Sequence, residues 1–150
     1  MDKLELMIEF PRLAPPATFE ITSPRTRAYN CVAWAAGDTQ RKWWPDRMNV
    51  AYWPRGVPRE ATLPAFIAAY ATLGYEVCAS GEIEGGFEKI AIYAKPAGTP
   101  AHAARQLPNG KWTSKLGDEE DIEHDLQCLK CMRYGEVRQF MKRAVPPVTA

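Results

Sequence analysis

Two apolar segments with helical spacing stand in the first half of the chain. Residues 31–36 lie between Asn30, which is a good N-cap, and Gly37, which is typical of a helix C-terminus, so they predict a short helix. A second helix is expected from Thr62 to Leu73. Residues 38–61 between them are rich in Trp, Pro and Arg without a hydrophobic period, which predicts a long loop.

The middle of the chain changes to the period of two that is typical of strands. Strands are expected at residues 75–79, 89–95, 101–107 and 111–116. The last two are joined by Pro108-Asn109-Gly110, residue types that favour a tight turn. These two strands are therefore predicted to form a hairpin.

Helical spacing returns after residue 117. One helix is expected at residues 118–129 and another at 136–143, where Val137, Phe140 and Met141 share one face. Helices on either side of an antiparallel sheet predict an α+β fold. Residues 1–150 are expected to form a single domain, because a chain of this length encloses one core.

Composition and charge exclude several classes of function. The chain has 46% hydrophobic residues, and 19 basic against 18 acidic residues leave a net charge of +1. The net charge is therefore too small to attract nucleic acid or an anionic membrane. Charges at Asp2, Lys3, Glu5 and Glu9 interrupt the apolar run that a signal peptide or membrane span requires, so a cytoplasmic protein is expected.

Cys31 and His102 are the residues best placed for chemistry. Thiols stay reduced in the cytoplasm, and Cys31 lies in the first turn of the expected helix, where backbone N–H groups favour a thiolate. His102 lies on the strand expected at 101–107. A cysteine on a helix and a histidine on a strand form the nucleophile and base of thiol hydrolases. The alternative is that both residues belong to the core.

A third group must orient the imidazole, and the hairpin turn determines which one can. A three-residue loop pairs Ala104 with Ser114, which places Ser114 on the His102 face of the sheet. A two-residue loop would instead bring Thr113 and Lys115 to that face. His124, the second histidine of the chain, is a further candidate for a group near His102.

Three short motifs resemble papain-like cysteine hydrolases, in particular the NlpC-type cell-wall endopeptidases and their bacterial relatives. Tyr29-Asn30-Cys31 resembles the aromatic-polar-cysteine start of their nucleophile helix, and His102 opens a strand as their base does. The segment 107–111 resembles their hairpin turn. Ser114 stands twelve positions after His102, where that branch carries its third polar residue.

The resemblance implies a papain-like α+β fold, with the nucleophile helix packed on a central antiparallel sheet and further helices at the C-terminus. Cys31 would be the nucleophile, His102 the base and Ser114 the orienting residue, while the backbone N–H of Cys31 and Tyr29 would shape the oxyanion site. The implied activity is hydrolysis of an amide or thioester in a peptide, a sugar-peptide or a modified protein, without a cofactor. The oligomeric state is left open.

A rival interpretation is a non-catalytic interaction module, such as an immunity or adaptor protein. The branch usually has Ser-Gly after its cysteine and His, Asn or Gln as its orienting residue. This chain has Val32-Ala33 and Ser114 at those positions, which favours the rival.

Three tryptophans of the long loop have two possible roles. Trp43, Trp44 and Trp53 can wall a cleft for a peptide or sugar-peptide above Cys31, or they can fill the core. The expected substrate-binding residues are these three and Tyr29.

A metal site is a further possibility but a weak one. On a helix at 118–129, His124, Cys128 and Cys131 would share one face and could bind zinc together with Cys78. A lone Cys-x-x-Cys is little support for such a site, so no metal is expected.

Overall fold

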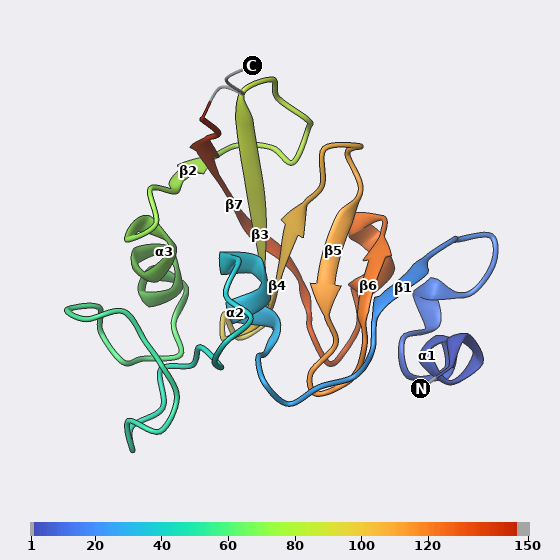
Figure 1. Ribbon diagram of the computed structural model, residues 1–150, viewed down its shortest axis with the longest axis horizontal. Coiled ribbons are helices and arrows are strands. Elements are labelled where there is room, and N and C mark those ends of the chain that lie inside the picture. Colours follow the sequence, from blue (N-terminus) through green and yellow to red (C-terminus); the bar gives the residue numbers. More distant parts are fainter. Residues whose placement is uncertain (1, 147–150) are drawn as a thin grey trace.

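In the computed structural model, which describes residues 2–146, the strands form one antiparallel sheet. Its strand order is β1-β6-β5-β4-β3-β7-β2 (Figure 1). The seven strands are β1 (Glu20–Ser23), β2 (Glu76–Cys78), β3 (Phe87–Ala94), β4 (Pro100–Gln106), β5 (Trp112–Lys115), β6 (Asp121–His124) and β7 (Glu136–Ala144). The helices among the described residues are α1 (Lys3–Glu9), α2 (Cys31–Ala36) and α3 (Leu63–Ala71), with 3₁₀ turns η1 (Pro11–Leu13) and η2 (Leu126–Leu129).

The expected papain-like α+β fold with helices at the C-terminus is wrong. The residues expected to be C-terminal helices form the strands β6 and β7 and the turn η2, so the fold is mostly one antiparallel sheet with three short helices among the described residues. In β7, the register with β3 shifts between Val137 and Gln139. This bulge interrupts strict alternation and puts Val137 and Phe140 on one face, at a spacing that imitates a helix.

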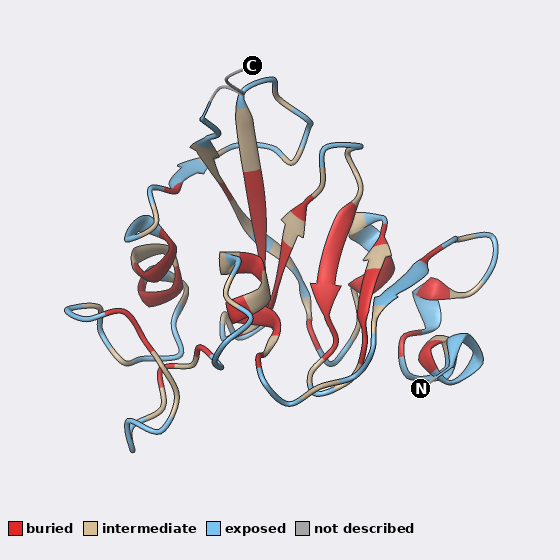
Figure 2. Cartoon of the chain, in the orientation of Figure 1, coloured by how far each residue is buried: buried red, intermediate tan, exposed pale blue. Residues whose placement is uncertain are grey.

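Both faces of the sheet are covered. On one face Ile90, Ile92 and Ala103 pack with α2 and α3 in a core cluster. On the other face Tyr93 and Ala104 pack with side chains from α1 and η1. Figure 2 shows the buried positions concentrated in the central strands and in α2 and α3. The α1 helix and the edge strand β1 were not expected from the sequence pattern.

The helix α2 begins and ends as predicted, and α3 begins as predicted but ends at Ala71, two residues before Leu73. The Asn30 side chain accepts the N–H of Ala33, and Gly37 ends α2 in the left-handed region with φ +82°. Thr62 caps α3 in the same way. No helix among residues 2–146 is long and apolar enough to cross a membrane.

The hairpin between β4 and β5 has the predicted three-residue loop. The N–H of Gly110 donates to the carbonyl of Leu107 at 2.9 Å, and Gly110 has φ +87°. The strands pair Arg105 with Thr113 and Gln106 with Trp112. This register excludes the two-residue loop, and α2 lies across β4 near this pairing (Figure 1).

Candidate active site

Cys31 is the first residue of α2 and is almost enclosed, with 8% of its surface exposed. Burial raises the pKa of its thiol to about 11, although backbone N–H groups of Ala103, Val32 and Cys31 itself act in the opposite direction. The expectation that the helix start would lower this pKa is therefore wrong. The thiol is neutral at physiological pH because desolvation of the anion outweighs the nearby N–H groups.

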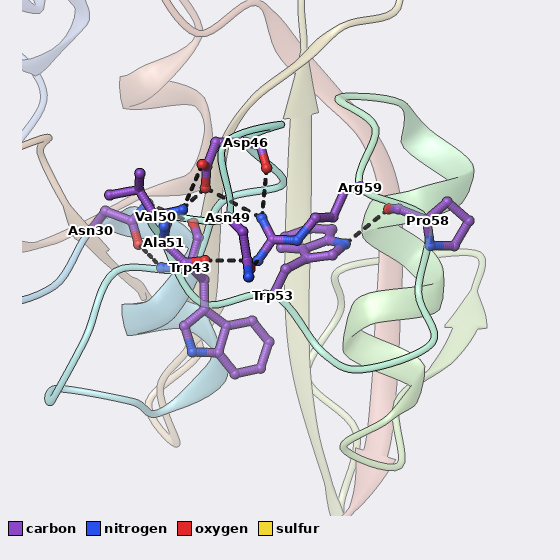
Figure 3. A network of polar contacts seen from close by, with 9 residues as sticks. All are labelled: Asn30, Trp43, Asp46, Asn49, Val50, Ala51, Trp53, Pro58 and Arg59. Carbon is purple, nitrogen blue, oxygen red and sulfur yellow. Dashed lines mark hydrogen bonds and ion pairs between the residues drawn. The ribbon is translucent and has the colours of Figure 1, made fainter.

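Asn30 fixes the start of α2 against the long loop. Its Oδ1 accepts the N–H of Ala33 at 3.1 Å. The same oxygen accepts the N–H of Trp43 at 3.0 Å, and Nδ2 donates to the Trp43 carbonyl at 2.7 Å (Figure 3). One amide side chain thus caps the helix and binds both backbone groups of a residue thirteen positions away. Cys31 is the next residue, so the hydrogen bonds of Asn30 also fix its backbone position.

The loop itself is organised around Asp46 and Arg59. The Asp46 carboxylate accepts the N–H groups of Val50 at 2.8 Å and Ala51 at 2.9 Å, which lowers its pKa. Arg59 donates to the carbonyls of Asp46 and Ala51 at 2.7 and 2.9 Å (Figure 3). Residues 38–61 therefore have a defined conformation despite their lack of helix or strand.

The loop tryptophans pack in the core cluster that also contains Cys31. Trp43 is 3% exposed and stacks on Tyr70 of α3, and Trp53 packs against Phe66 of the same helix. Trp44 is partly buried and also contacts Phe66 edge-on. The sequence allowed these three tryptophans to fill the core, and the structure shows that they do. Their role in binding a substrate stays a prediction.

A chain of hydrogen bonds runs through the buried imidazole of His102. Its Nε2 lies 2.9 Å from Ser114 Oγ, and the same oxygen lies 2.7 Å from Nε2 of His124. The other nitrogen of His124, Nδ1, lies 2.8 Å from the carbonyl oxygen of Asp125. The structure thus brings His102 together with both of its expected neighbours, Ser114 and His124.

The donor and acceptor of each of these hydrogen bonds follow from the last one, between His124 and the Asp125 carbonyl. A carbonyl oxygen only accepts, so Nδ1 of His124 carries the proton and its Nε2, in the neutral ring, accepts from the Ser114 hydroxyl. The Ser114 oxygen then accepts from Nε2 of His102. The proton of His102 is therefore on Nε2, and Nδ1 holds a lone pair.

Both imidazoles are neutral in the folded protein. Burial lowers the pKa of His124 to about 4, and burial, followed by repulsion from the protonated form of His124, holds the pKa of His102 well below its usual value. Nδ1 of His102 is buried and has no hydrogen-bond partner. A buried ring nitrogen whose lone pair accepts no hydrogen bond is uncommon in a protein interior.

Cys31 lies close to the backbone segment that carries this imidazole. The N–H of Ala103 acts on the sulfur, and Ala103 directly follows His102 in β4. No hydrogen bond joins the sulfur to the imidazole among the described residues. The ring of Tyr134 stacks on His102, with centroids 4.1 Å apart and planes 12° apart.

Tyr29 has a structural contact that the resemblance did not imply. Its hydroxyl donates to the Asp121 carboxylate at 2.6 Å, and its ring stacks on Trp34. Because this hydroxyl is already bonded, it is not free to donate to an oxyanion. The alternatives to Ser114 lie on the opposite face: Thr113 accepts from the Trp34 indole, and Lys115 contacts the carbonyl of Glu119.

The expected grouping of His124, Cys128 and Cys131 on one helix face does not form. His124 is in β6, Cys128 in η2, and Cys131 in a turn that pairs with Gly135. No group of three His, Cys, Asp or Glu residues among residues 2–146 could hold a metal ion. All four cysteines are free thiols.

Sequence reasoning missed Tyr134 as part of the site and did not identify the bond between His124 and Ser114. The second could have been found from a strand at residues 121–124. A hairpin of that strand with β5 pairs Ser114 with Ile122 and brings His124 to the same face. The contact of Tyr134 with His102 has no local signal, because it joins a turn to a distant strand.

Comparison with known proteins places the chain in one family. The family described as "Domain of unknown function (DUF7689)" matches residues 20–142, so the chain belongs to it. The match includes Cys31, His102, Ser114, His124 and Tyr134. No curated protein and no solved structure matches the chain significantly.

Proposed function

We propose that this member of the DUF7689 family is a cysteine hydrolase that cleaves an amide or thioester, with Cys31 as nucleophile and His102 as general base. The observation that carries the proposal is the open Nδ1 of a fully buried imidazole whose other nitrogen is held by Ser114. The proposal uses the kind of chemistry that the resemblance to NlpC-type endopeptidases implies, and it does not depend on a papain-like architecture. It needs no cofactor.

In the proposed reaction, the Cys31 sulfur attacks the substrate carbonyl while its proton moves to Nδ1 of His102. The S–C bond forms as the carbonyl π pair moves onto oxygen. When the intermediate collapses, the C=O bond re-forms, the bond to the leaving nitrogen or sulfur breaks, and His102 gives the proton to the leaving group. Water then attacks the thioester with His102 as base, which releases the acid and restores the thiol.

Both partners are neutral before the reaction, and this agrees with a base that accepts the proton during attack. A thiol with a pKa of about 11 contributes almost no thiolate at pH 7, so the sulfur depends on His102 for activation. Ser114 and His124 keep the accepting lone pair on Nδ1. They are positioning residues in this proposal.

The substrate class in the proposal is a peptide, sugar-peptide or modified protein. With 8% of its surface exposed, Cys31 offers little area for contact, which suits a thin acyl segment better than a bulky one. A cytoplasmic location is part of the proposal because the mechanism requires a reduced thiol. The near-neutral net charge supports neither nucleic acid nor a membrane as partner.

A second candidate function is a non-catalytic interaction module. The observation that favours it is the closed state of the site, with a high thiol pKa and Tyr134 over the imidazole. In that case the hydrogen-bonded chain would serve only to satisfy buried polar groups. The two functions differ in whether Cys31 can be acylated.

The test is acylation by p-nitrophenyl acetate at pH 7, followed by release of p-nitrophenolate and by peptide mapping of the acetyl group. We expect one acetyl group on Cys31 and its loss by hydrolysis. Cys31→Ser abolishes this labelling, and His102→Gln slows it roughly 100-fold, the scale of a general base. Cys128→Ser is the matched control, since Cys128 is also a buried free thiol.

Labelling that falls only on the partly exposed Cys78 and Cys131, with Cys31 untouched in the folded protein, would contradict the hydrolase and favour the interaction module.

A further inference from the structure

The Tyr134 hydroxyl is a buried donor without a partner. Tyr134 is 4% exposed, and its hydroxyl oxygen makes no hydrogen bond. A buried phenol normally finds an acceptor, so an unpaired one calls for a functional reason. Two other buried tyrosines use their hydroxyls: Tyr93 donates to the Leu126 carbonyl at 2.8 Å and Tyr70 to that of Val32 at 2.9 Å. The Tyr75 hydroxyl is also without a hydrogen bond, but Glu88 lies near it.

The ring that carries this hydroxyl is held on both sides. It stacks on His102, and its other neighbour is Phe10, with centroids 5.3 Å apart. The turn that presents it is closed by two backbone hydrogen bonds between Cys131 and Gly135, at 3.1 and 2.7 Å. A Cβ on Gly135 would lie 1.9 Å from the Ala94 carbonyl oxygen, so this turn is seated directly on β3.

The hydroxyl also lies within electrostatic range of the nucleophile. After burial, the charge of Cys31 is the largest cause that raises the pKa of Tyr134, ahead of the opposing charge of the adjacent Arg133. The stacked pair of rings therefore holds two unpaired polar atoms, and one of them, the Tyr134 hydroxyl, interacts electrostatically with the thiol. Nδ1 of His102 is an acceptor, and the Tyr134 hydroxyl is a donor.

A proton acceptor and a hydrogen-bond donor beside a thiol are the two groups that acyl transfer requires. The acceptor takes the thiol proton, and the donor stabilises the negative charge that develops on the carbonyl oxygen. Tyr29, the side chain that the resemblance assigned to the oxyanion site, is bonded to Asp121. The Tyr134 hydroxyl has no such competing acceptor.

We propose that Tyr134 is a further catalytic residue, whose hydroxyl donates a hydrogen bond to the oxyanion formed when Cys31 attacks a carbonyl. This inference rests on the proposed hydrolase function. The phenol keeps its proton throughout: the carbonyl π pair moves onto oxygen as the S–C bond forms, and it returns when the bond to the leaving group breaks. The hydrogen bond exists only while the oxygen carries charge.

The test compares two reactions of Cys31 in Tyr134→Phe. Acylation by p-nitrophenyl acetate passes through an oxyanion, whereas alkylation by iodoacetamide displaces iodide and forms none. We expect Tyr134→Phe to slow acylation about 100-fold, the scale of one lost oxyanion donor, and to leave alkylation unchanged. Phenylalanine keeps the ring stack on His102, and removal of an unpaired buried hydroxyl should not lower stability.

Tyr93→Phe is the matched control, because Tyr93 also contacts the His102 ring, edge-on at 5.2 Å, but uses its hydroxyl elsewhere. This variant should acylate at the rate of the parent protein. Equal acylation by Tyr134→Phe and the parent, with Cys31→Ser inactive, overturns the role of Tyr134 and leaves the hydrolase standing. An equal fall in acylation and alkylation also overturns it, since that pattern indicates a packing role. Acylation that survives Cys31→Ser refutes the hydrolase itself.

Discussion

The Ser114 hydroxyl donates to Nε2 of His124 across 2.7 Å, and this bond determines which nitrogen of a third residue can accept a proton. Because the hydroxyl has a single proton, its oxygen must accept from Nε2 of His102. Nδ1 of His102 is then left as the base. The chemistry proposed for Cys31 depends on this direction.

Ser114→Ala should therefore remove activity without removing the nucleophile. The variant leaves Nε2 of both histidines unpaired and frees the tautomer of His102, so acylation of Cys31 by p-nitrophenyl acetate should fall about 100-fold. Thr113→Ala is the matched control, because it also deletes a bonded hydroxyl of β5, on the opposite face. Equal rates for the two variants would show that the Ser114 bond does not orient the base.

Protonation of His124 should destabilise the fold in acid. Its pKa is lowered from 6.5 to about 4 by burial, so above pH 6.5 the ring is neutral in both the folded and the unfolded state and its contribution to stability is complete. As the pH falls from 6.5 to about 4, the unfolded state binds the proton first and stability is lost. The loss is roughly 3 kcal/mol at 1.36 kcal/mol per pKa unit.

Urea unfolding of the parent and of His124→Gln, at pH 7 and at pH 4.5, measures this effect. The free energy of unfolding of the variant should change less between the two pH values. His102 keeps its own contribution in both proteins, in the same direction. A variant whose free energy falls as steeply as that of the parent would mean that His124 already titrates normally in the folded state.

Tyr29→Phe should cost more stability than Tyr70→Phe. Both lose one buried hydroxyl, but Tyr29 donates to the Asp121 carboxylate at 2.6 Å and Tyr70 to a neutral carbonyl at 2.9 Å. The other oxygen of Asp121 is buried without a hydrogen bond, so the variant leaves that carboxylate with no bonded donor. We expect about 2–3 kcal/mol for Tyr29→Phe and about 1 kcal/mol for Tyr70→Phe, measured by urea unfolding. The reverse order would contradict the view that the hydrogen bond of Tyr29 is the stronger of the two.

Gly135→Ala should disrupt the turn that carries Tyr134. Its Cβ would overlap the backbone of Ala94 at 1.9 Å, and φ is +75°. Gly110→Ala is the matched control, because Gly110 has φ +87° but open space around its Cβ. Only the conformational cost of about 1 kcal/mol should appear at Gly110, and about 3 kcal/mol or more at Gly135. Similar unfolding midpoints for the two variants would show that the turn can move away from β3.

Local signals predicted the elements around the site. Asn30 and Gly37 determine the ends of α2 because capping involves groups within a few residues. The turn at Pro108-Asn109-Gly110 determines the register of β4 and β5, which brought Ser114 to the His102 side. Each of these predictions depended on contacts that are close in sequence.

The C-terminal strands could not be predicted in this way. The bulge opposite Ile92 and Tyr93 gives β7 an apolar spacing that fits a helix, and only pairing with β3 and β2 stabilises it as a strand. The loop tryptophans had a similar ambiguity. An indole near a nucleophile can bind a ligand or fill the core. Trp43 and Trp53 fill the core because they pack against side chains of α3.

The sequence by itself determined where the chain turns, where α2 and α3 begin, that Cys31 opens α2 and that His102 lies on a strand, since caps, turns and glycines act over a few residues. Tertiary structure alone decided whether these groups are ionised and which residues surround them. Burial made Cys31 and His102 neutral, strand pairing brought His124 to Ser114, and the 131–135 turn put Tyr134 over the imidazole. Desolvation and contacts between distant segments depend on the whole fold, so no local pattern encodes them.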